Sequence, residues 1–238
     1  MTAPILSMRG VSKRFTLHHQ NGVELPVLDN VDLQVHPGEC VVLDGSSGMG
    51  KSTLLKLAYA NYRATSGRIQ VLSNSGSLLE VTQASARELL QMRRETVGYV
   101  SQFLRVIPRV ASLDVVATAL TDGEVASPAA VADARAQAAE LLERLRIPER
   151  LWSLPPATFS GGEQQRINIA RSLIKPRALL LMDEPTASLD VANTRTVVQL
   201  IQEAVARGSA VVGIFHDPDV GFDVATRRID ISCFRSKP

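Results

Sequence analysis

Cysteines, long apolar runs and an excess of either charge are scarce or missing in this sequence. The two cysteines, Cys40 and Cys233, are too far apart for a metal-binding spacing and too few for a disulfide framework. Each lies in an apolar run, so we expect two buried, reduced thiols. No apolar run approaches the roughly 18 residues that a membrane-spanning helix needs, and residues 1–4 do not begin a secretory signal peptide. We therefore expect a soluble, cytoplasmic protein that reaches a membrane only through a partner.

The charges nearly cancel, since 26 basic and 24 acidic residues leave a formal net charge of +2. Nucleic-acid-binding domains usually carry a basic excess. We therefore expect no nucleic-acid partner and interpret the arginine pairs at 93–94 and 227–228 as solvated surface. With 238 residues, 45% of them hydrophobic, the chain is long enough to bury a sizeable core.

One glycine-rich stretch fits the phosphate-binding pattern G-x-x-x-x-G-K-[ST]. It follows an apolar run at 40–43, typical of a buried strand, and precedes a predicted helix at 51–58. Glycines allow sharp turns that expose backbone N–H groups to anionic oxygens, and a helix N-terminus adds unpaired donors. We expect Lys51 to reach the β- and γ-phosphates of a nucleotide and the Ser52 hydroxyl to bind Mg²⁺. The nucleotide-binding residues predicted in this stretch are Gly45, Ser46, Ser47, Gly48, Met49, Gly50, Lys51, Ser52 and Thr53.

The remaining patterns predict an α/β fold with a P-loop NTPase core, in which helices flank a mostly parallel sheet. Short strands at 5–9, 14–17 and 31–35 predict an N-terminal antiparallel β subdomain. Helical stretches punctuated by proline predict a helical lobe at approximately 103–160, inserted into a single domain that spans 1–238. Further strands are expected at 67–72, 97–101, 179–182, 210–215 and 228–234, and helices at 84–94, 129–146, 167–173 and 191–207.

Polar residues follow two of the buried strands. Asp183 and Glu184 come directly after the strand at 179–182, and His216 follows the strand at 210–215. Because the carboxyl ends of parallel strands meet at the ligand edge of a sheet, we expect the three side chains at one edge. Asp183 is predicted to hold Mg²⁺ through water, and Glu184 to orient or deprotonate an attacking water.

Two features stay ambiguous on residue chemistry alone. Phe15 either stacks on an adenine ring or packs in the core as an ordinary strand aromatic. Ser160, Gly161 and Gly162 precede the predicted helix at 167–173. They form either a second anion-binding helix start or a plain N-cap by Ser160.

In combination these motifs resemble the ATP-binding cassette (ABC) ATPase family over essentially the whole chain. The matching segments stand in the family's order, at 45–52, 102, 160–164, 179–184, 188–190 and 216. Phe159 and Glu163 stand where Leu and Gln are commoner in the family. Neither departure removes a chemical group, so the resemblance implies an active ATPase that binds ATP and Mg²⁺.

The resemblance also implies how two subunits assemble. They would form an ATP-dependent head-to-tail dimer, either a homodimer or a pair with a sister ABC subunit. Each ATP would lie between the phosphate loop of one subunit and a signature segment of the other, formed by Ser160, Gly161, Gly162 and Glu163. The remaining implied roles are γ-phosphate and Mg²⁺ sensing by Gln102, γ-phosphate binding by His216 and coupling across the interface by Asp190.

Two interpretations remain for the partner of such a cassette. Three stretches, at 97–110, 147–166 and 213–217, resemble the L-type ATPase of the bacterial carbon–phosphorus lyase system. That resemblance implies an ABC subunit that docks on a soluble enzyme core and supports transfer of a phosphonate to the ribose of ATP. The alternative is the motor subunit of a membrane ABC transporter or lipoprotein-release pump.

Overall fold

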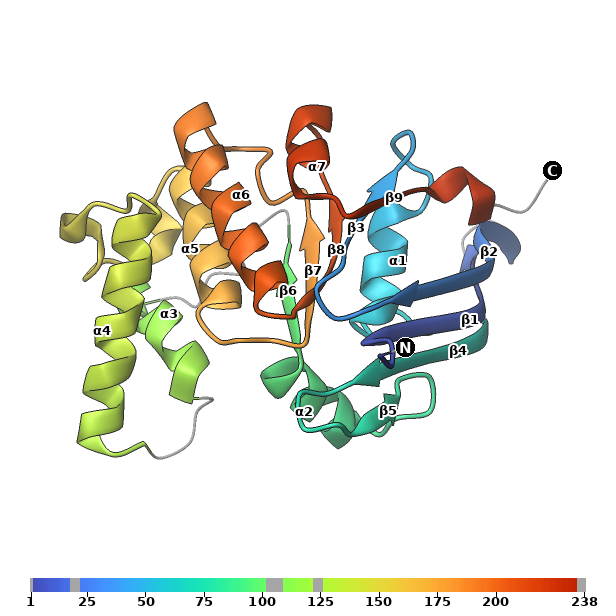
Figure 1. Cartoon of the computed structure of the whole chain (residues 1–238), viewed down its shortest axis with the longest axis horizontal. Coiled ribbons are helices and arrows are strands. Elements are labelled where there is room, and N and C mark those ends of the chain that lie inside the picture. Colours follow the sequence, from blue (N-terminus) through green and yellow to red (C-terminus); the bar gives the residue numbers. More distant parts are fainter. Residues whose placement is uncertain (1, 18–21, 102–108, 122–125, 235–238) are drawn as a thin grey trace.

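The structure is a computed structural model that describes residues 2–17, 22–101, 109–121 and 126–234. Two sheets and their covering helices form three regions along the molecule (Figure 1). An antiparallel sheet lies at one end, a parallel sheet lies in the middle, and helices α3 (Ser112–Thr121) and α4 (Pro128–Arg144) lie at the other end. This is the α/β P-loop NTPase fold, with an antiparallel subdomain and a helical lobe, that the sequence predicted.

The antiparallel sheet has the strand order β2-β1-β4-β5. Its strands are β1 (Leu6–Leu17), β2 (Val23–Val35), β4 (Ser66–Leu72) and β5 (Leu78–Glu80). The prediction of two short strands at 5–9 and 14–17 was wrong, because one strand runs through both. Register shifts between Met8 and Arg14 bend this strand at Gly10, whose φ of 60° favours glycine.

The parallel sheet has the order β6-β7-β8-β3-β9, and each neighbouring pair within it is parallel. Its strands are β6 (Val97–Val100), β7 (Leu179–Asp183), β8 (Ala210–Ile214), β3 (Cys40–Asp44) and β9 (Arg227–Asp230). The final strand was predicted at 228–234, yet it ends at Asp230. There the Asp230 carboxylate accepts a hydrogen bond from the Ser232 N–H at 2.9 Å, and a 3₁₀ turn (Ile231–Phe234) follows.

Both faces of the parallel sheet are buried, which explains its uninterrupted apolar runs. Along β3, Val41 and Leu43 join a core shared with the antiparallel sheet and with α1 (Lys51–Ala58). Cys40 and Val42 face the opposite core, which contains the apolar residues of α5 (Gly161–Leu173) and α6 (Val191–Ala206) and of the helical lobe. The sheet is thus held on both sides, and its carboxyl edge is a rigid platform.

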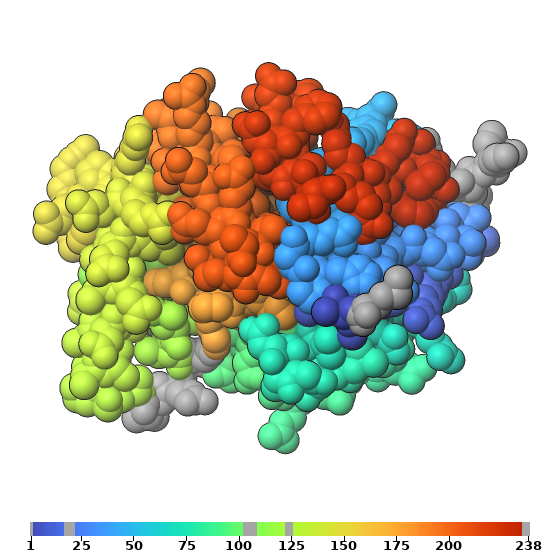
Figure 2. All heavy atoms as spheres, in the orientation of Figure 1, coloured from blue at the N-terminus to red at the C-terminus, as the bar shows by residue number. Residues whose placement is uncertain are grey.

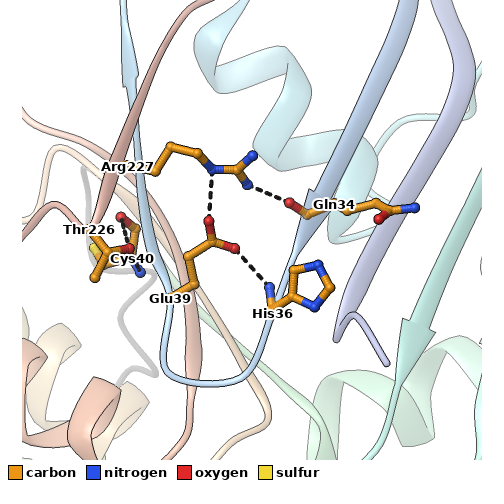
Figure 3. Close-up of polar contacts among 6 residues, drawn as sticks. All are labelled: Gln34, His36, Glu39, Cys40, Thr226 and Arg227. Carbon is orange, nitrogen blue, oxygen red and sulfur yellow. Dashed lines mark hydrogen bonds and ion pairs between the residues drawn. The ribbon is translucent and has the colours of Figure 1, made fainter. Parts of the chain in front are cut away.

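The amino end of this sheet is joined to the antiparallel subdomain by a polar cluster (Figure 3). The Arg227 guanidinium contacts the Glu39 carboxylate at 2.7 Å and donates to the Gln34 carbonyl. Glu39 in turn accepts from the His36 N–H at 2.9 Å. The Glu39 carboxylate thus links the turn between β2 and β3 to Arg227 at the start of β9. Arg227 is nevertheless exposed, as predicted, whereas Arg228 is half-buried and donates to the Asp44 carboxylate at 2.8 and 2.6 Å, which corrects its interpretation as solvated surface.

The two cysteines differ in environment. Cys40 is buried in β3, and burial raises the pKa of its thiol to about 12. Cys233 is exposed, contrary to the prediction of a buried thiol, because the chain leaves the sheet at Asp230. No described helix is long and apolar enough to span a membrane.

Candidate functional site

The phosphate loop joins β3 to α1 and takes its shape from three glycines. Gly45, Gly48 and Gly50 have φ values of 124°, 78° and 99°, a region that side chains with a Cβ rarely adopt. A Cβ on Gly45 would also lie 2.8 Å from the Ile231 methyl group. Met49 packs against the apolar core beneath the loop. The backbone of the loop is therefore exposed to solvent, while the Met49 side chain anchors the loop to the core.

Lys51 begins α1 and folds back over this loop. Its ammonium group donates to the carbonyl oxygens of Gly45 and Ser46, the latter at 2.9 Å. A cation placed inside a cradle of exposed backbone is suited to nucleotide phosphates, which supply the stronger charged acceptor. Thr53, two residues after Lys51 on α1, is half-buried.

Ser52 and Asp183 meet beneath the loop although 131 residues separate them in sequence. The Ser52 hydroxyl donates to Asp183 Oδ1 at 2.8 Å, and Asp183 is only 8% exposed. Among the described residues, no cluster of three His, Cys, Asp or Glu side chains forms a metal site. A hydroxyl and one carboxylate fit Mg²⁺, which keeps several waters and takes further oxygens from nucleotide phosphates.

Glu184 and His216 leave neighbouring strands at the same edge. β7 and β8 pair in parallel up to Asp183 and Ile214, so Glu184 follows the end of β7 directly and His216 lies two residues beyond the end of β8. Glu184 is half-buried and has a positive φ of 53°, and its N–H donates to the Ile214 carbonyl at 3.0 Å. This left-handed backbone at a non-glycine residue turns the chain sharply into Pro185.

His216 is exposed and lines a hollow of about 640 Å³ together with Thr186 and Leu189. The hollow lies beside α6 and α7 (Pro218–Val224), whose surfaces are side by side in orange and red in Figure 2. His216 is therefore open to solvent at the edge that also carries Glu184.

The signature segment starts α5 and is shaped by a capping box. The Ser160 hydroxyl accepts from the Glu163 N–H at 3.4 Å, and the Glu163 carboxylate accepts from the Ser160 N–H at 2.9 Å and from its hydroxyl at 2.7 Å. These hydrogen bonds lower the pKa of Glu163. Ser160 is therefore the N-cap of α5, which was one of the two alternatives for this residue. The other alternative, an anion-binding helix start, stays a prediction.

The two glycines of the signature segment differ in their surroundings. A Cβ on Gly162 would lie 2.8 Å from the Ser188 carbonyl oxygen, whereas a Cβ on Gly161 meets nothing within 4 Å. Gly162 thus lets the loop before α6 approach, and that loop ends at Asp190. Asp190 caps α6, since its carboxylate accepts from the Asn193 N–H and side-chain amide, each at 2.8 Å. Among the described residues, nothing near Gly161 gives a comparable reason for a glycine.

Two predicted site residues stand apart from this arrangement. Phe15 is half-buried on β1 and packs edge-on against Tyr62, with ring centroids 5.2 Å apart, and it is not among the buried core residues. Its adenine-stacking role stays a prediction. Gln102 lies outside the described residues.

Residue patterns missed Tyr99, which contacts Asp183, and two side-chain amides that contact the end of β6. The Tyr99 hydroxyl donates to Asp183 Oδ2 at 3.1 Å, and burial together with the Asp183 charge raises the Tyr99 pKa. Gln165 and Asn168 donate to the Ser101 carbonyl at 3.4 and 2.8 Å, which ties α5 to the end of β6. Their i, i+3 spacing on one helix was the available signal. For Tyr99, nothing local in the sequence pointed to Asp183.

The comparison with known families decides the protein family. The profile of the family described as ABC transporter matches residues 28–187, which include the phosphate loop and the end of β7. This chain belongs to the ABC transporter ATPase family.

Curated relatives and a solved structure extend this assignment over nearly the whole cassette. The lipoprotein-releasing system ATP-binding protein LolD 2 of Caulobacter vibrioides is 40% identical over 92% of this chain and 91% of its own. The macrolide export ATP-binding/permease protein MacB of Wolinella succinogenes is 36% identical over 92% of this chain, which spans only 32% of MacB. A dimeric ATP-binding cassette in a post-hydrolysis state with ADP and Pi superposes with a TM-score of 0.84 at 28% identity, covering 97% of this chain and 94% of its own. The cassette is therefore an ATP-hydrolysing ABC ATPase.

The phosphonate interpretation was wrong. Relatives that match this cassette over about 90% of its length carry the names of lipoprotein-release and macrolide-export ATP-binding proteins. Part of the stretch at 147–166 that carried the resemblance packs within the helical lobe. The Trp152 indole donates to the Ile147 carbonyl at 3.0 Å, and the Ser112 hydroxyl donates to the Leu151 carbonyl at 2.7 Å.

Proposed function

We propose that this ABC cassette is the ATP-hydrolysing subunit of a membrane-bound export or lipoprotein-release system and acts on a separate membrane-embedded permease. The supporting observation is the 40% identity to LolD 2, which is matched over 91% of its length. On this proposal the chain is one ATP-binding domain with a helical lobe at approximately 103–160. It works at the cytoplasmic face and attaches to the membrane only through its partner.

The chemistry proposed for the site follows from the groups at the sheet edge. Lys51 and the exposed N–H groups of the loop hold the β- and γ-phosphates of ATP, and Ser52 binds Mg²⁺ while Asp183 binds it through water. When bound, Mg²⁺ neutralises charge on the phosphates. Glu184 accepts a proton from the attacking water, and His216 donates to the γ-phosphate. Gln102, beyond the described residues, is proposed to contact Mg²⁺ and the γ-phosphate.

A head-to-tail dimer is proposed because Gly161 of the signature segment has no packing role among the described residues of its own subunit. Gly161 is exposed, and no atom of the described chain requires it to be glycine. The start of α5 carries unpaired N–H donors and the positive end of the helix dipole, which suit a phosphate group. A partner's nucleotide that approaches this backbone closely would explain the glycine. The dimer could be homomeric or formed with a sister cassette.

The two signature glycines provide a matched test of this dimer. Gly161→Ala should leave the thermal unfolding midpoint unchanged yet weaken ATP-dependent dimerisation in a Glu184→Gln background, because the methyl group fills only the space between subunits. Gly162→Ala should lower the unfolding midpoint, because its Cβ meets the Ser188 carbonyl at 2.8 Å. Differential scanning fluorimetry and size-exclusion chromatography with ATP measure the two effects. Normal dimerisation of Gly161→Ala would remove the argument for a nucleotide at this position.

The partner is tested by purifying the Glu184→Gln variant with ATP from detergent-solubilised membranes of the native host. We expect stoichiometric recovery of a protein with several membrane-spanning segments. We also expect this protein, in liposomes, to change the ATP hydrolysis rate of the parent cassette. Lys51→Ala, which should bind ATP more weakly, is the control for non-specific capture at an ATP concentration that saturates only the Glu184→Gln variant. Recovery of soluble enzyme subunits alone would contradict the proposed export function.

A further inference from the structure

Both oxygens of the Asp183 carboxylate are held by hydroxyl groups. Oδ1 accepts from Ser52 at 2.8 Å, and Oδ2 accepts from Tyr99 at 3.1 Å. An ionised carboxylate offers about four acceptor positions, so two positions remain for other ligands. Their direction depends on the rotation of the carboxylate, a torsion that is intrinsically soft.

Tyr99 is held in place by the pairing of its backbone and by the stacking of its ring. Its backbone lies in β6, paired with Leu181 of β7, two residues before Asp183. Its ring stacks on Tyr59, with centroids 4.9 Å apart and an interplanar angle of 22°. Tyr59 follows the last residue of α1, the helix that starts with Lys51 and Ser52. The phenol hydroxyl is therefore held by the same helix and sheet that carry the phosphate loop and Asp183.

Arg93 of α2 (Ala86–Glu95) completes this arrangement. Its guanidinium lies 4.9 Å from the Tyr59 ring centroid and donates to the carbonyls of Tyr59 and Ala60 at 3.1 and 3.0 Å. The Tyr59 ring is thereby held in position against Tyr99. Among the hydrogen bonds of the described residues, the one from the Tyr99 hydroxyl connects this stack to Asp183.

We propose that Tyr99 is a positioning residue that orients the Asp183 carboxylate toward the Mg²⁺ of the ATP site. This inference rests on the proposed metal site. A hollow of about 820 Å³ is lined by Tyr99 and Asp183 together, so water can replace a lost hydroxyl. Water restores a hydrogen bond to Oδ2 but does not fix its direction. Removing the hydroxyl should therefore loosen metal binding and leave the fold and the metal-free nucleotide affinity intact.

The test measures metal affinity directly, without turnover. Mn²⁺ replaces Mg²⁺, and its free concentration is followed by electron paramagnetic resonance in the Glu184→Gln background with bound ATP, after unbound ATP has been removed because it would itself chelate Mn²⁺. Tyr99→Phe keeps the stacked ring and should weaken Mn²⁺ binding about ten-fold, the lower range for outer residues that orient a metal ligand. ATP affinity in EDTA and the unfolding midpoint should stay unchanged.

Tyr59→Phe is the matched control, because it keeps the same stack and, among the described contacts, the Tyr59 hydroxyl has no hydrogen bond to Asp183. Its Mn²⁺ affinity should equal that of the parent. Equal weakening in both variants, or none in Tyr99→Phe, would overturn the inference. Asp183→Asn distinguishes failure of the proposed metal site from failure of the role of Tyr99. If Asp183→Asn still binds Mn²⁺ normally, the metal site is misassigned and the role of Tyr99 is rejected with it. If Asp183→Asn loses Mn²⁺ while Tyr99→Phe keeps it, only the role of Tyr99 is rejected.

Discussion

Glu184→Gln is expected to bind ATP normally, to hydrolyse it about a hundred- to ten-thousand-fold more slowly, and to accumulate as an ATP-bound dimer. The rate loss is the usual size for removing a general base. Glutamine has the same shape, so it preserves the turn after β7, where the Glu184 N–H donates to the Ile214 carbonyl at 3.0 Å. It cannot accept a proton at neutral pH. Phosphate release and light scattering with ATP and Mg²⁺ measure the two effects.

Glu203→Gln is the control for the loss of a carboxylate. Glu203 is partly exposed on α6, where it pairs with Arg144 at 2.6 Å and Arg207 at 3.8 Å. It lies outside the proposed site, so its loss should leave hydrolysis at the parental rate. If Glu184→Gln hydrolyses ATP like the parent, Glu184 is not the base.

Lys51→Ala is expected to weaken ATP binding by about ten- to a hundred-fold. Hydrogen bonds to charged groups contribute about 1.5–3 kcal/mol each, and about 1.4 kcal/mol corresponds to a factor of ten in affinity. The ammonium group already lies inside the loop, 2.9 Å from the Ser46 carbonyl, so ATP would meet it in place. Isothermal titration calorimetry with ATP gives the dissociation constant.

Lys56→Ala is the matched control for Lys51→Ala. It removes a lysine from the same helix, one whose ammonium group lies 5.6 Å from the Tyr62 ring centroid and not in the loop. Its ATP affinity should match the parent. Unchanged ATP binding by Lys51→Ala would remove the phosphate-loop assignment, because a lysine cradled by this loop has no other evident use.

Much of the fold was predictable because its signals are local. The runs at 40–43, 179–182 and 210–215 are apolar at every position, as expected of strands buried on both faces. The errors lie where a tertiary contact overrides the local pattern. β1 continues through Gly10 because β2 and β4 pair with it on both sides, and β9 stops at Asp230 because that side chain caps the following turn.

The residues of the candidate site likewise fall into those predicted from local motifs and those that only tertiary contacts reveal. Ser52 and Asp183 were predicted separately from motif spacing, and their hydrogen bond of 2.8 Å brings together the two predictions. Tyr99 was missed because a tyrosine in an apolar strand has no local mark of function, and only the pairing of β6 with β7 brings it to Asp183. The partner was misjudged because the resemblance at 97–110, 147–166 and 213–217 covers short stretches, whereas the match to LolD 2 extends over 92% of the chain.

The sequence by itself determined the order of the chemical groups and the class of fold. Glycine spacing, strand-length apolar runs and the residues that follow them are covalent properties of the chain, and the ligand edge of a parallel sheet follows from them. The tertiary structure alone decided which of these groups touch. Ser52, Tyr99 and Asp183 come from α1, β6 and β7, and no local interaction links those elements along the chain. Their meeting depends on sheet register and on the burial of both faces of the sheet, which are properties of the folded molecule as a whole.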